Sequence, residues 1–132
     1  MTIRYLSATE LLYLNAYLSQ REKMPFGIKS LSALEEAIAR PQLKLEGDYE
    51  PFPDVWQKAA ALVDSCVKQK PFVKMNALTG FFGADLFLRL NGQVLRSAPE
   101  DLEYIGSMAL QQETLPQIAA WLTNRATAQE TI

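Results

Sequence analysis

The sequence predicts one all-α domain, with about six helices around a buried central helix. Four capping-box patterns, each a Ser or Thr followed three residues later by Glu or Gln, mark helix starts, because each side chain can accept a hydrogen bond from the other residue's backbone N–H. The patterns are Ser7/Glu10, Ser32/Glu35, Ser97/Glu100 and Thr114/Gln117. Apolar residues recur between them at helical spacing. Residues 77–90 are apolar on nearly every side, which is typical of a helix at the centre of a domain.

The first two helices are expected over residues 8–20 and from residue 32 to about residue 40. Pro25 and Gly27 interrupt the chain between them, and Pro41 ends the second helix because proline disfavours helical backbone in the residue before it. The buried faces are predicted to be Leu11, Leu14 and Leu18 in the first helix, and Leu34, Ala37 and Ile38 in the second.

A short non-helical segment is expected next. Residues 43–46 alternate between apolar and charged, Gly47 and Asp48 can form a turn, and residues 49–52 can return along the first strand. We therefore expect a short hairpin, or flap, before the third helix. Its candidate partner-binding residues are Leu43, Leu45 and Tyr49. They lie beside an acidic run formed by Glu46, Asp48, Glu50 and Asp54.

The rest of the chain is predicted to be helical almost to its end. The expected helices cover residues 54–69, 77–90, 99–111 and 115–125. Gly80 and Gly83 would allow neighbouring helices to approach closely, which offsets part of their helix cost of about 1 kcal/mol each. We expect a domain over residues 1–125 and a frayed tail over residues 126–132.

Composition excludes several chemistries. The chain has no histidine, so imidazole bases, histidine metal ligands and Ser/His or Cys/His nucleophile pairs are excluded. Cys66 is the single cysteine, which excludes an internal disulfide and favours a reducing, cytoplasmic setting. A net charge of −2 argues against general nucleic-acid binding. No apolar run of about 18 residues predicts a membrane span, and no signal peptide is expected.

The loop before the helix that we expect to be the most buried, residues 77–90, is the candidate site. Lys70 and Lys74 flank Phe72, and Asn76 stands at the expected helix start, with Lys68 nearby. Free N–H groups and the partial positive charge of a helix N-terminus attract anions, so these residues predict a phosphate site. A structural interpretation accounts for the same residues: Lys68 and Lys70 favour a helix C-terminus, Asn76 caps the next helix and Phe72 belongs to the core.

Residues 70–92, KPFVKMNALTGFFGADLFLRLNG, resemble the central motif of the Fic/Doc family, and of its Doc (death-on-curing) branch in particular. That motif reads approximately His-x-Phe-x-Asp/Glu-Gly/Ala-Asn-Lys-Arg-Thr and is followed by an apolar helix that ends in Asn-Gly. The resemblance extends in order and spacing over about residues 5–123. An unrelated helical adaptor would need this match to be accidental.

The resemblance implies a six-helix core with a flap, and a nucleotide-dependent transferase site. In that family the histidine is a general base, the acidic residue binds magnesium, and Asn, Lys and Arg hold nucleotide phosphates. Members transfer adenylyl groups to proteins. Doc-type members are toxins that phosphorylate elongation factor Tu and are neutralised by a small antitoxin.

This chain departs from the motif where that chemistry lies. Lys70 stands at the histidine position and Lys74 at the acidic position, while Met75, Ala77 and Leu78 replace the small residue, the Lys and the Arg. Phe72, Asn76 and Thr79 are retained: Phe72 and Thr79 are the structural residues of the motif, and Asn76 is either a phosphate ligand or a helix cap. Lys74 would repel the divalent cation that a carboxylate binds, and two phosphate-holding cations are absent.

Two functional hypotheses follow. In the first, a degenerate toxin-type protein without normal transferase activity, cofactor or metal binds a protein partner, such as an antitoxin-like peptide or a translation-factor-like target. Homo-oligomerisation through the same surface is also open. In the second, a divergent phosphoryl- or nucleotidyl-transferase uses ATP and magnesium, with Lys70 in the base position and Lys74 and Asn76 on a phosphate-bearing substrate.

Overall fold

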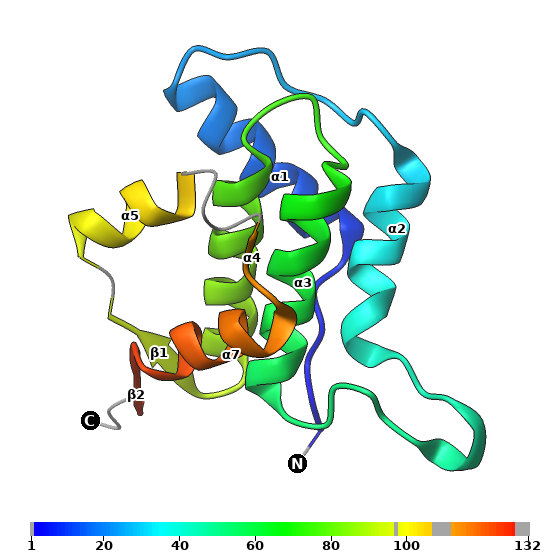
Figure 1. Ribbon diagram of the computed structural model, residues 1–132. Coiled ribbons are helices and arrows are strands. Elements are labelled where there is room, and N and C mark those ends of the chain that lie inside the picture. Colours follow the sequence, from blue (N-terminus) through cyan, green and yellow to red (C-terminus); the bar gives the residue numbers. More distant parts are fainter. Residues whose placement is uncertain (1, 97, 107–111, 129–132) are drawn as a thin grey trace.

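The computed structural model describes residues 2–96, 98–106 and 112–128, and it is largely helical (Figure 1). Its α-helices are α1 (Ala8–Arg21), α2 (Leu31–Ala39), α3 (Val55–Gln69), α4 (Asn76–Leu90), α5 (Pro99–Gly106) and α7 (Leu115–Thr123). Two 3₁₀ helices follow α2: η1 (Arg40–Gln42) directly precedes the flap, and η2 (Glu46–Asp48) lies in it. Two short strands, β1 (Gln93–Leu95) and β2 (Ala126–Ala128), pair antiparallel. The predicted all-α domain is therefore confirmed, with one small strand pair in addition.

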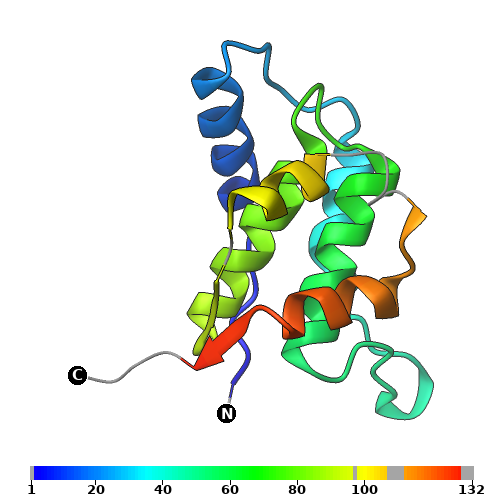
Figure 2. The ribbon, with the colours of Figure 1, turned by 60° about the vertical axis from the view of Figure 1, so that its left-hand side comes forward.

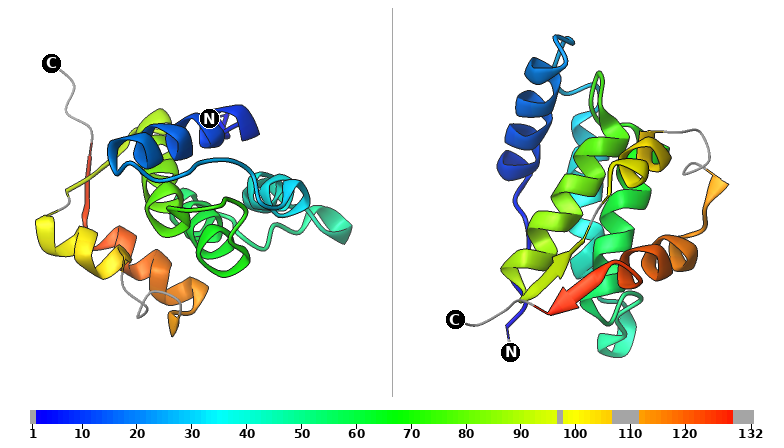
Figure 3. Two further views of the ribbon diagram at one scale, coloured as in Figure 1. Left: turned by 90° about the horizontal axis from the view of Figure 1, so that it is seen from above. Right: turned by 90° about the vertical axis from the view of Figure 1, so that its left-hand side faces the viewer.

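The centre of the domain is shared by α3 and α4, which lie side by side (Figures 1 and 2). Residues 58–67 of α3 are all buried, and α4 buries Phe81, Phe87 and Leu88 among others. Helices α1 and α2 pack against α4 and α3 respectively, and α7 packs against α3. Figure 3 shows α5 and α7 on the side of α4 away from α2. The helix that is apolar on nearly every side is thus central, together with the helix before it.

Two glycines of α4 permit this close packing. A Cβ added at Gly80 would lie 2.8 Å from the Cβ of Cys66 in α3, and one added at Gly83 would lie 2.7 Å from Cδ1 of Leu11 in α1. Separations below 3.0 Å require a shift of the neighbouring atom. The expectation that these glycines bring helices together is confirmed.

Helix starts agree with the predicted caps at two of four places. The Ser7/Glu10 and Thr114/Gln117 boxes form with both reciprocal hydrogen bonds. The prediction for α2 is wrong, because Ser30 and not Ser32 accepts a hydrogen bond from the backbone N–H of Ala33. Ser97 lies outside the described residues.

The end of the chain also differs from expectation. Residues 126–128 are not frayed but form β2, which pairs with β1 in the register Gln93 to Ala128. Arg125 supports this pair, because its guanidinium forms an ion pair with Asp101 of α5 at 2.9 Å and lies 3.9 Å from the centroid of the Trp121 ring. Residues 129–132 lie outside the described part. No described helix has the length and apolar character needed to span a membrane.

Candidate functional site

The predicted site loop reverses the chain between the two central helices. Lys70 ends α3 and Met75 precedes α4, and both have left-handed backbone, with φ of 48° and 64°. The N–H of Lys70 still donates to the carbonyl of Cys66 at 3.2 Å. Non-glycine residues adopt this backbone rarely, so the surrounding contacts must hold the loop in place.

Those contacts come from the α1–α2 loop. Phe72 is fully buried and forms an antiparallel bridge with Ile28. The N–H groups of Lys29 and Ser30 donate to the carbonyl of Pro71, and the N–H of Val73 donates to the carbonyl of Gly27. The two loops therefore form one paired unit at the end of the molecule that is uppermost in Figure 1. Phe72 anchors it as a core residue.

Asn76 does not cap α4, so that part of the structural interpretation is wrong. It is the first residue of the helix, and its side chain turns back to Phe72. Its Oδ1 accepts from the N–H of Phe72 and its Nδ2 donates to the carbonyl of Phe72, both at 2.9 Å. Both amide atoms are thus occupied in holding the loop.

Thr79 and Asn15 hold the other side of the loop. The buried Thr79 hydroxyl donates to the carbonyl of Met75 at 2.6 Å. The Nδ2 of Asn15, on α1, donates to that hydroxyl at 3.1 Å and to the carbonyl of Lys74 at 2.8 Å. Sequence reasoning missed Asn15, although a polar residue on the apolar face of a helix is the signal that could have found it.

The predicted lysine cluster does not form around the loop as a whole. Lys68 points to Asp64, with which it forms an ion pair, and donates to the carbonyl of Glu113 at 2.8 Å. Lys70 and Lys74 are exposed, and within the described residues neither forms an ion pair. Two solvated ammonium groups therefore remain beside the start of α4.

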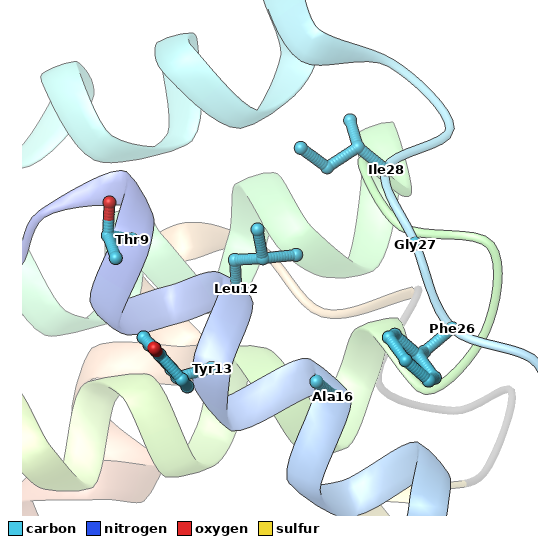
Figure 4. Close-up of a pocket in the computed structure, with 7 residues that line it drawn as sticks. All are labelled: Thr9, Leu12, Tyr13, Ala16, Phe26, Gly27 and Ile28. Carbon is cyan, nitrogen blue, oxygen red and sulfur yellow. The ribbon is translucent and has the colours of Figure 1, made fainter.

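Apolar hollows lie on both sides of α1 near this loop. One, of about 530 Å³, is lined by Thr9, Leu12, Tyr13, Ala16, Phe26, Gly27 and Ile28 (Figure 4). The other, of about 340 Å³, lies against the start of α4 and is lined by Leu14, Tyr17, Leu18, Arg21, Glu22, Met75, Leu78, Phe82 and Leu102. Met75 and Leu78, two of the residues that depart from the motif, thus face an apolar space.

The flap is present but contains little strand. Leu45 and Tyr49 form a single antiparallel bridge around η2, with the N–H of Leu45 donating to the carbonyl of Tyr49 at 2.7 Å. Gly47 adopts φ of 74° at the tip. The predicted hairpin is therefore reduced to one bridge, which leaves Leu43, Leu45 and Tyr49 exposed.

Lys58 fastens the flap to the core, and sequence reasoning missed this role. Its side chain is only 2% exposed. The Nζ donates to the carbonyl of Pro41 at 3.0 Å and to Oε1 of Glu50 at 3.2 Å, and it lies 5.5 Å from the centroid of the Tyr5 ring. A lysine directly before the apolar run of α3 was the available signal.

Metal sites and reactive thiolates require particular arrangements of acidic side chains and of the surroundings of the thiol. Among the described residues, no group of three or more acidic or cysteine side chains is placed to hold a metal ion. Burial raises the pKa of the Cys66 thiol from 9.0 to about 12, so the reactive thiolate is strongly disfavoured at neutral pH.

The comparisons with known proteins address the predicted family. No family model matches the chain. The protein named Toxin Doc from Mycolicibacterium smegmatis is 33% identical to it over 109 residues, an alignment that covers 79% of this chain and 82% of that protein. The similarity spans most of both chains and includes much more than the motif. Together with the helical core and the loop before α4, it shows that this protein belongs to the Fic/Doc family, within the Doc branch.

Proposed function

We propose that this protein is a toxin-type member of the Doc branch that acts by binding a protein partner, without nucleotide-dependent transfer. The observation that carries the proposal is the position of Met75 and Leu78, which line an apolar hollow where the family resemblance places phosphate contacts. Phosphoryl transfer depends on cations and polar donors that position and neutralise phosphates. Apolar side chains supply neither.

The residues present do not fit a magnesium–nucleotide complex. Mg²⁺ requires oxygen ligands, usually one or two carboxylates together with substrate phosphates. The residue at the acidic position is the exposed Lys74, and the amide of Asn76 is occupied by the backbone of Phe72. We therefore assign no reaction step to a bound metal or nucleotide.

Lys70 is also poorly suited to replace the histidine as a base. A lysine becomes a useful base when burial or a neighbouring cation disfavours its ammonium form. Lys70 is exposed at the left-handed end of α3, and water can solvate its ammonium group. The exposure of Lys70 therefore argues against a catalytic role for this residue, and its position at the end of α3 supports a role in the chain reversal.

The flap offers a surface for a protein partner. Leu43, Leu45 and Tyr49 are exposed on a segment that Lys58 holds against the core, so the surface is partly preorganised. An extended peptide can add to such a segment through backbone hydrogen bonds, with apolar side chains as anchors. An antitoxin-like peptide is the first candidate, because the relative is named a toxin. A translation-factor-like target is the second, and the cytoplasm is the expected setting.

The test compares two sets of variants in the same assays. If the partner is a target, growth inhibition on expression should be lost in Leu45→Asp and Tyr49→Asp. If the partner is an antitoxin-like peptide, the same two changes should abolish binding of that peptide and leave growth inhibition in place. Either effect should be absent in Lys70→Ala and Lys74→Ala, with Lys29→Ala as a control for removing an exposed lysine nearby. Calorimetric titration with ATP, with and without magnesium, should show no saturable binding. Saturable binding that Lys74→Ala abolishes, together with transfer of label to protein, would instead support the divergent transferase.

A further inference from the structure

Charge is segregated to two opposite ends of this molecule. The paired loops, residues 21–29 and 70–74, carry five cations and one carboxylate. The flap, residues 43–54, carries four carboxylates and one lysine. Figures 1 and 2 and the right-hand view of Figure 3 agree in placing these segments at opposite ends. The chain as a whole is slightly acidic, with a net charge of −2, so the basic end arises because the fold brings these two lysine-containing loops together.

Each of these ends also exposes large apolar side chains. At the basic end, the groove of Figure 4 runs between α1 and residues 26–28, and its wall includes Tyr13, which is 74% exposed, and Phe26, which is 52% exposed. At the acidic end, Leu45 is 50% and Tyr49 is 62% exposed. A groove with basic surroundings therefore faces away from an apolar, acidic loop of the same chain.

We propose that the flap of a second copy of this chain docks into this groove, in a head-to-tail contact. Leu45 and Tyr49 are bridge partners, so their side chains emerge on the same face of the flap, about 5 Å apart. The groove wall runs along α1 from Thr9 to Ala16, about 10 Å at the rise of an α-helix. Two adjacent side chains fit a groove of that length.

The charges beside these apolar groups complete the match. Glu46 and Asp48 lie between Leu45 and Tyr49 at the tip of the flap, are exposed, and form no ion pair within the described residues. Lys23 and Lys29, in the loop that carries Phe26, are also exposed and also form no ion pair within the described residues. Docking brings these two sets of unpaired charges together at the rim of the contact.

The contact uses a different surface on each partner, so it is heterologous and leaves one free flap and one free groove in every open assembly. Assemblies therefore grow with concentration unless a ring closes. A flap tip buries little area, so we expect a dissociation constant on the order of 10 µM to 1 mM. The inference rests on the proposed function only in treating the flap as a binding surface.

Sedimentation equilibrium of the purified chain tests the proposal. At low salt the weight-average mass should rise between about 10 and 500 µM, and 0.5 M salt should reduce that rise. Tyr49→Ser in the flap, or Phe26→Ser in the groove, should keep the chain monomeric. Leu102→Ser removes an exposed apolar side chain that belongs to neither the flap nor the groove, so it should leave the association unchanged.

Mixing the two variants gives the decisive result. Phe26→Ser keeps its flap and Tyr49→Ser keeps its groove, so an equimolar mixture should form a dimer and nothing larger. A wild-type chain that stays monomeric overturns the proposal and leaves the groove to a foreign partner. A mixture that stays monomeric also overturns it. Because the assay contains only this chain, its failure leaves the growth and nucleotide tests of the proposed function unaffected.

Discussion

Replacing Asn76 with alanine tests whether this residue serves the fold or a ligand. The change removes two hydrogen bonds to the backbone of Phe72, each 2.9 Å long. Each is worth about 1 kcal/mol. Phe72 is fully buried, so its N–H and carbonyl are also left without a partner or water, which adds about 1–3 kcal/mol for the pair. We therefore expect a loss of about 3–5 kcal/mol in the free energy of unfolding.

Urea denaturation followed by circular dichroism measures this loss, and hydrogen exchange locates it. The N–H of Phe72 should lose protection in the variant. Asn91→Ala is the control, because Asn91 holds the backbone of Arg4 through the same two kinds of hydrogen bond, and its Nδ2 also donates to the carbonyl of Phe87 at 2.7 Å. It should cost about 1–3 kcal/mol, since water can replace the exposed partners, and it should leave Phe72 protected. A loss below about 0.5 kcal/mol in Asn76→Ala would refute the structural role and return Asn76 to the ligand interpretation.

Three further changes have expected outcomes. Lys58→Met should cost about 1–3 kcal/mol and speed proteolysis of the flap, because Glu50 and the carbonyl of Pro41 lose their cation; unchanged proteolysis would contradict this anchoring. Gly80→Ala should lower the free energy of unfolding, measured by urea denaturation, by about 1–2 kcal/mol, since the added Cβ meets the rigid Cβ of Cys66. Gly83→Ala should cost less, because its added Cβ meets the flexible end of the Leu11 side chain. Burial raises the pKa of the Cys66 thiol from 9.0 to about 12, so the unfolded chain loses this proton at a lower pH than the folded chain. The free energy of unfolding should therefore be unaffected below pH 9 and fall as pH rises toward 12, by up to about 4 kcal/mol. Urea midpoints at pH 8 and pH 10.5 should therefore differ more in the wild type than in Cys66→Ala.

Local patterns predicted the helices well. The Ser7/Glu10 and Thr114/Gln117 boxes formed because a capping box is complete within three residues and needs no distant partner. The cap of α2 was misplaced by two residues because a second serine, Ser30, competes with Ser32. Which serine caps depends on where the chain turns, and the backbone of Ser30 is fixed by its hydrogen bond to Pro71, far away in the sequence.

The candidate site was predicted in position but not in the roles of its residues. The sequence placed Lys70, Phe72 and Asn76 in a loop at the start of a central helix, and the structure confirms that location. It did not reveal that Lys68 turns away to Asp64, or that Asn15 reaches the loop from α1. Both contacts depend on how separate helices pack.

The sequence by itself determined that this chain is helical, that residues 77–90 form a central helix, and which family the loop resembles. Helical periodicity and capping are local properties, and the motif is contiguous. Only the tertiary structure decided what the polar residues do. The amide of Asn76 faces Phe72, Lys58 is buried beneath the flap, and residues 126–128 pair with β1. The physical reason is that a polar group excluded from water must find a partner, and the fold brings that partner from elsewhere in the chain.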